Sequence, residues 1–365
     1  MSENEGLPGT GIEPRHNIEL AVTITAPPSD GLSALAKSAL AAGMPDETLR
    51  VFERGWNDFQ AWCARVNRSS LPATSDTVTE YVTWLCYGYT SDKGVRGRSL
   101  AWIGQARWAV SKAHEMADLD PPPMKKAVIV VKGYKAHLAQ NRDRRAKPQQ
   151  VTAITLASLQ KLADAQDTSK LSGLRDRAMV LLDYSAAARV TELIGINIED
   201  VADLPDGLLV SIYRRKTRRF DEVAIPDAYA PLAVKAIREW CAALAALGRT
   251  TGPLFVRIDK HGRVGACAWR TRKKREGEPE GDAEGRMSAN AAERCIKRAQ
   301  LAAGVEGRIT AHSGRRGLAT EARKAGHDRI RIARHGGWDD NSPVLSRYME
   351  DADKWTDNPL NGAGL

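Results

Sequence analysis

One change of pattern, over residues 208–226, most constrains the fold of this chain. Leu208–Tyr213 and Glu222–Pro226 are rich in aliphatic and β-branched residues and flank a short basic turn, which predicts two strands of a hairpin. The patterned segments on both sides repeat apolar residues every three or four positions, which is typical of helices. We therefore expect a mainly α fold with one small antiparallel β-sheet.

The chain of 365 residues is long enough for two domains. A Gly-rich, mixed-charge insertion at 270–286 predicts a mobile loop inside the second of them. Along the sequence we expect, in order, a mostly disordered segment at 1–44, a helical bundle at 45–140, a basic linker at 141–152, a mainly helical second domain with the small sheet at 153–350, and a C-terminal tail at 351–365.

Composition excludes several classes of protein. No apolar run approaches the ~18 residues that a membrane span needs, and the N-terminus lacks a basic-then-apolar leader. The five cysteines lie at least 23 positions apart without a CxxC pair, which disfavours zinc sites and disulfide frameworks. We expect a cytoplasmic protein with no membrane partner, no metal, no cofactor and no small-molecule substrate.

The charge distribution indicates a polyanion as the partner. The net charge is +9, and the excess is local: residues 101–150 hold 10 basic against 4 acidic side chains, and residues 251–300 hold 12 against 7. Solvated helix faces would give the same count. As phosphate contacts we predict the basic side chains of the linker, the hairpin turn and one helix start: Arg144, Arg145, Lys147, Arg214, Arg215, Arg218, Arg219 and Arg316.

Polar residues also gather at four places where packing alone does not require them. Arg189 and Glu192 lie three apart after an apolar helix, and Lys216 lies in the basic turn. His312 and Arg315 lie three apart at a predicted helix start, where both could face one anion. Trp338 follows a Gly-Gly pair, and Tyr348 comes ten residues later. Each feature has an ordinary alternative: a surface ion pair, a solvated turn or a core aromatic.

The order of these features resembles that of the tyrosine recombinases, the phage integrase family. The likeness covers about residues 155–350, and the preceding helical bundle is similar to the core-binding domain of the family. Three details resemble the Cre recombinase branch: HSGRRG at 312–317, GGW at 336–338 and RRKT at 214–217. The resemblance implies a clamp of two domains around DNA.

The resemblance also implies a role for each of these residues. Tyr348 would attack a DNA phosphodiester and form a 3′-phosphotyrosine, and Lys216 would protonate the departing 5′ oxygen. Arg189 and Arg315 would bind the non-bridging oxygens. His312 and Trp338 would donate hydrogen bonds to the phosphate, and Glu192 would orient Arg189 and His312.

Further expectations concern assembly and the reaction. The family pattern implies four protomers on double-stranded DNA with inverted-repeat core sites, exchange through a Holliday junction, no need for metal or ATP, and a tail that docks on a neighbouring protomer. Two alternatives stay open. A type IB-like topoisomerase or a telomere resolvase would use the same chemistry, and a regulator without catalysis would use the basic surfaces to bind specific DNA.

Overall fold

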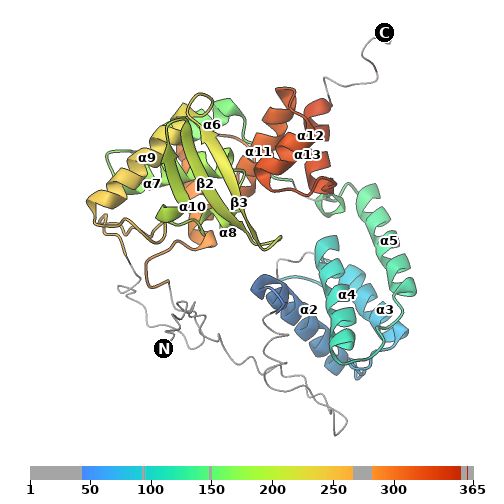
Figure 1. The fold of residues 1–365 in the computed structure, drawn as a ribbon. Helices are drawn as coiled ribbons and strands as arrows, with labels where there is room; N and C mark the ends of the chain where they lie inside the picture. Colours follow the sequence, from blue (N-terminus) through green and yellow to red (C-terminus); the bar gives the residue numbers. More distant parts are fainter. Residues whose placement is uncertain are drawn as a thin grey trace, which may run out of the picture. The chain divides into compact units, whose positions relative to one another are not determined.

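The computed structural model describes residues 43–92, 94, 96–147, 150–265, 282–354 and 360 (Figure 1). Three predicted segments lie mostly outside the described residues: the disordered segment at 1–44, the loop at 270–286 and the tail at 351–365. The chain divides into two compact units between Gln149 and Gln150, within the segment that we expect to be a linker. Each unit has its own hydrophobic core.

The first unit is a bundle of helices, as its apolar spacing predicts. Thr74 and Ser99 cap two of them through their side-chain oxygens, and the core includes Phe52, Phe59 and Tyr81. The elements are α2 (Asp46–Arg65), α3 (Ser75–Thr83), a π-helical turn (Trp84–Gly88), α4 (Leu100–Met116), α5 (Lys125–Gln140) and a 3₁₀ turn (Arg144–Ala146).

The second unit is helical around one small sheet, which confirms the predicted fold class. Its helices are α6 (Leu156–Asp164), α7 (Leu171–Ser185), α8 (Val190–Leu193), a 3₁₀ turn (Ile198–Asp200), α9 (Pro231–Ala246), α10 (Ala289–Ala303), α11 (Ala311–Lys324), α12 (Arg329–Gly336) and α13 (Pro343–Asp353). No described helix is long and apolar enough to cross a membrane.

The sheet has the antiparallel order β1 (Val201–Leu204), β2 (Gly207–Arg214) and β3 (Arg219–Pro226). Side chains alternate along β2, so Val210 and Ile212 lie buried while Tyr213 faces solvent beside Phe220 of β3. The sequence pattern predicts β2 and β3 but misses β1, because this strand has four residues and only its first is partly buried.

Two cores stabilise the second unit. The larger one lies under the sheet, where the indole N–H of Trp240 donates to the Leu254 carbonyl at 2.8 Å. The smaller one joins α11, α12 and α13, which lie together in Figure 1, and it includes Ala319, Ile332 and Leu345. Trp338 belongs to the smaller core and Tyr348 packs against it, so this cluster positions both aromatic site candidates.

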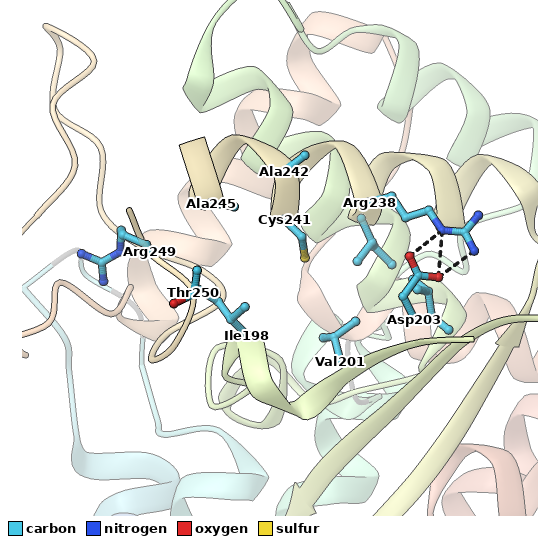
Figure 2. A pocket seen from close by; sticks show the side chains of 11 residues that line it. Ile198, Val201, Asp203, Arg238, Cys241, Ala242, Ala245, Arg249 and Thr250 are labelled. Carbon is cyan, nitrogen blue, oxygen red and sulfur yellow. Dashed lines mark hydrogen bonds and ion pairs between the residues drawn. The ribbon is translucent and has the colours of Figure 1, made fainter. Parts of the chain in front are cut away.

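A shallow pocket of about 380 Å³ lies between α9 and the β1–β2 edge of the sheet (Figure 2). Its lining includes Val201, Cys241 and the side chain of Arg238. Arg238 binds Asp203 at 2.8 Å and Asp227 at 3.0 Å, so its charge is already paired. None of the predicted catalytic residues lines this pocket.

Candidate active site

Arg189 begins α8 just after a break in the chain. Helix α7 ends at Ser185, and Ala187 adopts a left-handed φ of 45°, which costs an L-residue about 1 kcal/mol. Glu192 then accepts from the Arg189 backbone N–H at 3.0 Å and from the Arg189 Nη1 at 2.5 Å. The predicted pair therefore exists, with Glu192 buried and Arg189 half-buried.

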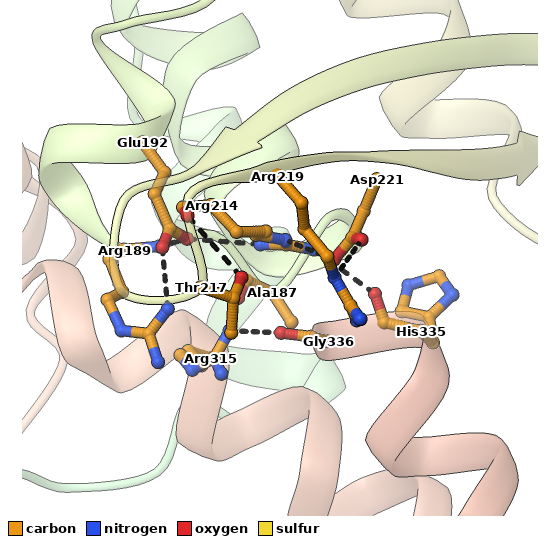
Figure 3. A network of polar contacts seen from close by, with 10 residues as sticks. All are labelled: Ala187, Arg189, Glu192, Arg214, Thr217, Arg219, Asp221, Arg315, His335 and Gly336. Carbon is orange, nitrogen blue, oxygen red and sulfur yellow. Dashed lines mark hydrogen bonds and ion pairs between the residues drawn. The ribbon is translucent and has the colours of Figure 1, made fainter. Parts of the chain in front are cut away.

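Arg214 is not on the tip of the hairpin, where we expect it to contact DNA. Its side chain is only 1% exposed and extends between Glu192 Oε2, at 3.1 Å, and Asp221 Oδ2, at 3.3 Å (Figure 3). The His335 carbonyl accepts a third bond at 3.3 Å. The reason is strand parity: β2 runs one residue beyond Tyr213, so Arg214 falls on the inner face with Ile212.

Glu192 is thus the shared acceptor of two arginines. Burial by itself would raise the pKa of its carboxyl, but the Arg189 backbone N–H and the Arg189 and Arg214 charges outweigh it, so the pKa lies below its usual value. The sequence predicts that Glu192 orients Arg189 and His312. The hydrogen bonds of the structure join it to Arg189 and Arg214 instead.

Helix α11 presents His312 and Arg315 from its first two turns, after a cap by Thr310. His312 is exposed overall, yet protein atoms crowd its ring; this desolvation, with the nearby Arg315 and Arg189 charges, lowers its pKa. Arg315 is 3% exposed, and its Nη1 donates to the carbonyls of Ala187 and, at 2.5 Å, Gly336.

The other terminal nitrogen of Arg315, Nη2, is buried and has no hydrogen-bond partner among the described residues. Desolvation and the neighbouring Arg189 and Arg214 charges lower the pKa of Arg315 to about 9, so it stays protonated at neutral pH. A buried, charged donor without an acceptor is costly. An anion at this position would remove that cost.

Both glycines of HSGRRG allow a close approach. A Cβ on Gly314 would overlap the Asp183 carboxylate, and a Cβ on Gly317 would overlap the Ile154 carbonyl. Asp183 is buried, and desolvation followed by the charge of Glu293 raises its pKa well above the usual value, against the opposing effect of Arg315. The motif therefore lets α7 and the start of the second unit pack directly on α11.

The Gly-Gly-Trp segment places an aromatic ring under Arg315. Gly337 ends α12 with a φ of +62°, and a Cβ there would lie 2.7 Å from Arg214 Nε; a Cβ on Gly336 would overlap the Trp338 ring. The Arg315 guanidinium lies 3.7 Å from the centroid of the Trp338 ring. Tyr348 of α13 meets that ring edge-on at 6.4 Å.

Residues 152–354 match the model of the phage integrase family. The chain belongs to this family, the tyrosine recombinases. It is 27% identical over 343 residues to an integrase/recombinase xerD homolog of Selenomonas ruminantium, covering 91% of this chain and 90% of the relative. It is 32% identical over 120 residues to a tyrosine recombinase XerD of Neisseria meningitidis, covering 32% of this chain and 39% of that protein.

Solved structures of tyrosine recombinases share the fold. A XerH site-specific recombinase bound to a palindromic substrate in a post-cleavage complex has a TM-score of 0.60 at 13% identity, covering 90% of this chain and 82% of that one. A lambda integrase dimer bound to a core site has a TM-score of 0.52 at 17% identity, covering 86% and 75%.

Within this tyrosine recombinase fold, the predicted site residues fall into two groups. Direct contacts or charge interactions bring Arg189, Glu192, Arg315, Trp338 and Tyr348 together. Lys216 is exposed on the turn between β2 and β3, as are Arg215 and Arg218. Arg219, the first residue of β3, is also exposed and pairs with Asp221 at 2.8 Å. No group of three or more His, Cys, Asp or Glu side chains in the described ranges could hold a metal ion.

Two predicted phosphate contacts are engaged inside the protein. Arg145 binds Asp143 at 2.6 Å and donates to the backbone carbonyl of Gly97, whereas Arg144 and Lys147 are exposed. Arg316 binds Asp351 at 2.5 Å and is mostly buried. Sequence reasoning also missed Asp221 as the partner of Arg214 and Arg219, and Asp351 as the partner of Arg316. Strand parity is the only signal that could have indicated Asp221. The three-residue spacing from Tyr348 is the only signal that could have indicated Asp351.

Proposed function

We propose that this chain is a site-specific DNA recombinase that cuts and rejoins strands through a 3′-phosphotyrosine. The observation that carries the proposal is the convergence of Arg315, with its unpartnered Nη2, on the ring of Trp338 and the edge of Tyr348. A phosphate at Arg315 would satisfy the buried donor and lie beside a phenol. The family membership of residues 152–354 supports the same reaction.

The proposed step is one phosphoryl transfer. The Tyr348 phenol gives its proton to solvent water, and its oxygen forms a bond to phosphorus as the bond from phosphorus to the 5′ oxygen breaks. Lys216, on an exposed and basic turn, gives a proton to the departing 5′ oxygen. A 5′-hydroxyl of another strand then reverses these events. The bond energy is retained in the phosphotyrosine, so the step needs no ATP.

Charge on the phosphoryl oxygens is neutralised by arginines in this proposal. Arg189 and Arg315 donate planar pairs of N–H groups, Glu192 holds Arg189, and His312 and Trp338 add hydrogen bonds. His335 is a poorer candidate than Trp338, because its Nε2–H donates to the Ser185 carbonyl at 2.6 Å. Since cations of the protein supply the neutralisation, we expect cleavage in EDTA.

We propose an assembly of four protomers on two inverted-repeat sites, with a Holliday junction as the intermediate. A lambda integrase tetramer bound to such a junction has a TM-score of 0.50 at 17% identity. In this proposal the first unit is a core-binding domain that closes with the second around the duplex, as in Cre-like recombinases. The tail expected at 351–365 docks on a neighbour through its residues beyond α13, because Asp351 and Asp353 of that helix bind arginines of α11 in the same chain. Arg144, Lys147 and the exposed hairpin cations would bind backbone phosphates.

Covalent capture tests the reaction. The wild-type protein and Tyr348→Phe are incubated in EDTA with a nicked library of randomised inverted repeats and run on a denaturing gel. We expect an adduct with the wild type only, and equal DNA affinity. Adducts in both proteins would exclude Tyr348 as the nucleophile.

Other outcomes of the same experiment point to the alternatives. Binding by both proteins without any adduct would favour a regulator. Relaxation of a supercoiled plasmid without pairing of sites would favour a topoisomerase.

A further inference from the structure

Arg316 of α11 joins two other parts of the second unit: α13 and the residues just before α6. Its Nη2 binds Asp351 Oδ2 at 2.5 Å and donates to Gln150 Oε1 at 2.7 Å, and its Nη1 donates to the Val151 carbonyl. Its guanidinium also lies 5.7 Å from the centroid of the Tyr348 ring. The side chain is only 12% exposed.

Residues 150–154, which we call the entry segment, lie against α11. The Thr152 backbone N–H donates to the Arg308 carbonyl at 2.9 Å, and the Ile154 N–H donates to the Ser313 carbonyl at 3.2 Å. Gly317 allows the Ile154 carbonyl to approach the helix. The entry segment is therefore fixed along the same helix that carries Arg315, and Arg316 lies beside it.

Asp351 extends this connection to α13. Tyr348 and Asp351 are three residues apart on that helix and so share a face. The guanidinium spreads its donors over separate nitrogens, so Nη2 holds Asp351 and Gln150 while Nη1 holds the Val151 carbonyl. The ammonium of lysine presents its three donors from a single atom and does not reproduce this planar arrangement. The geometry thus ties the helix of the proposed nucleophile to the entry segment through one side chain.

We propose that Arg316 is a positioning residue that fixes Tyr348 against α11 and couples the position of α13 to the entry segment. The predicted effect on cleavage rests on the proposed function, whereas the structural coupling of α13 to the entry segment does not. The entry segment begins within the expected linker at 141–152 and starts where the second unit starts, so a displacement of the linker would be transmitted to the nucleophile. Arg316 then acts on cleavage without a phosphate contact of its own.

The chain offers a matched control. Arg323 also lies on α11 and binds Asp353 of α13 at 2.8 Å, but none of its described contacts involves Tyr348 or the entry segment. Arg316→Gln and Arg323→Gln each remove one ion pair between the same two helices. A role limited to holding the helices together predicts equal effects.

Single-turnover cleavage at saturating DNA is the first measurement. We expect Arg316→Gln to lower the rate about 100-fold, the order that a misplaced reacting group costs. Asp351→Asn, which keeps the shape of the side chain, should lower it about tenfold. Arg316→Lys should lie between the wild type and Arg316→Gln. Arg323→Gln should stay within about threefold of wild type, and all four should keep their DNA affinity within about threefold.

Two results would overturn the proposal. Equal cleavage rates for Arg316→Gln and Arg323→Gln would mean that Arg316 only holds α11 and α13 together. A normal rate at saturating DNA, combined with weaker binding and a smaller salt dependence, would make Arg316 a phosphate contact.

Hydrogen exchange of the DNA-free protein tests the coupling without any reaction. Gln150→Ala changes a side chain outside α13, so faster exchange of amides 343–353 in this variant would show that the entry segment stabilises α13. Unchanged exchange there would overturn the coupling. If the wild type forms no covalent adduct but Gln150→Ala loosens α13, the proposed function fails and the coupling stands.

Discussion

The Arg315 guanidinium lies 3.7 Å above the centroid of the Trp338 ring, and Tyr348 meets the same ring edge-on. One buried indole, 8% exposed, therefore contacts both the Arg315 cation and the ring of the proposed nucleophile. The ring also belongs to the small core of α11–α13. Its roles in packing and in catalysis can be separated by substitution.

Trp338→Phe retains an aromatic ring for Arg315 and removes only the N–H donor and part of the surface. We expect this variant to fold well and to cleave about 10- to 100-fold more slowly, because a hydrogen bond to the phosphate is lost. Trp338→Ala should in addition lose about 3–5 kcal/mol of unfolding free energy. Urea denaturation and adduct formation measure the two effects. Wild-type cleavage by Trp338→Phe would contradict a donor role for the indole.

Glu192→Gln should destabilise the protein by about 3–5 kcal/mol at neutral pH, because two buried or half-buried arginines lose their shared charge. The pKa of Glu192 is lowered in the folded state, so its stabilisation is present above the unfolded pKa of about 4.3 and is lost as the pH falls through the folded value. The difference in unfolding free energy between Glu192→Gln and the wild type should therefore become smaller at acid pH. Glu222→Gln, on the exposed face of β3, is the control and should change stability by less than about 0.5 kcal/mol. A constant difference at all pH values would argue against the ion pairs as the cause.

Arg215→Ala and Arg214→Met should behave differently although the residues are adjacent. Arg215 is exposed, so its loss should reduce the slope of log affinity against log salt concentration by about 1. Arg214 is buried between Glu192 and Asp221, so its loss should lower stability by about 3 kcal/mol and leave the slope unchanged. Fluorescence anisotropy across a salt series measures the slope. A reduced slope for Arg214→Met would mean that Arg214 reaches DNA.

Gly314→Ala should cost about 1–3 kcal/mol, because its Cβ would overlap the Asp183 carboxylate. In an Asp183→Ala background the same change should cost less, with a coupling of about 1 kcal/mol or more in a double-mutant cycle. Gly104→Ala is the control: nothing lies within 4 Å of its Cβ, and a helical Ala should raise stability by about 0.5–1 kcal/mol. Additive effects of Gly314→Ala and Asp183→Ala on the free energy of unfolding would exclude the contact between the new Cβ and the Asp183 carboxylate.

The sequence pattern predicts those features of the fold that depend on residues close together in the chain. The hairpin at 208–226 and the pair of Arg189 with Glu192 both follow from spacing within a few residues. Strand β1 was missed because it has four residues and little burial. The inner position of Arg214 was missed because it depends on where β2 ends, and one residue of strand length reverses the face.

The internal roles of Arg145 and Arg316 could not be predicted in this way. Arg145 donates to a backbone carbonyl 48 residues away, and Arg316 binds an acid 35 residues away. A basic side chain gives the same sequence signal whether it faces DNA or a distant acceptor of its own chain. Only the folded arrangement distinguishes the two, and here it separates Arg316 from the exposed cations of the hairpin.

The Nη2 of Arg315, which has no hydrogen-bond partner among the described residues, has a thermodynamic consequence for the protein without DNA. Because an oxyanion at this nitrogen binds only the folded state, occupancy of the site and resistance to heat must rise together. A free inorganic phosphate or sulfate at a hundred times its dissociation constant would add about 2.7 kcal/mol to the free energy of unfolding. The melting temperature in an oxyanion series, at constant ionic strength, thus reports how well the site is formed before any DNA is present.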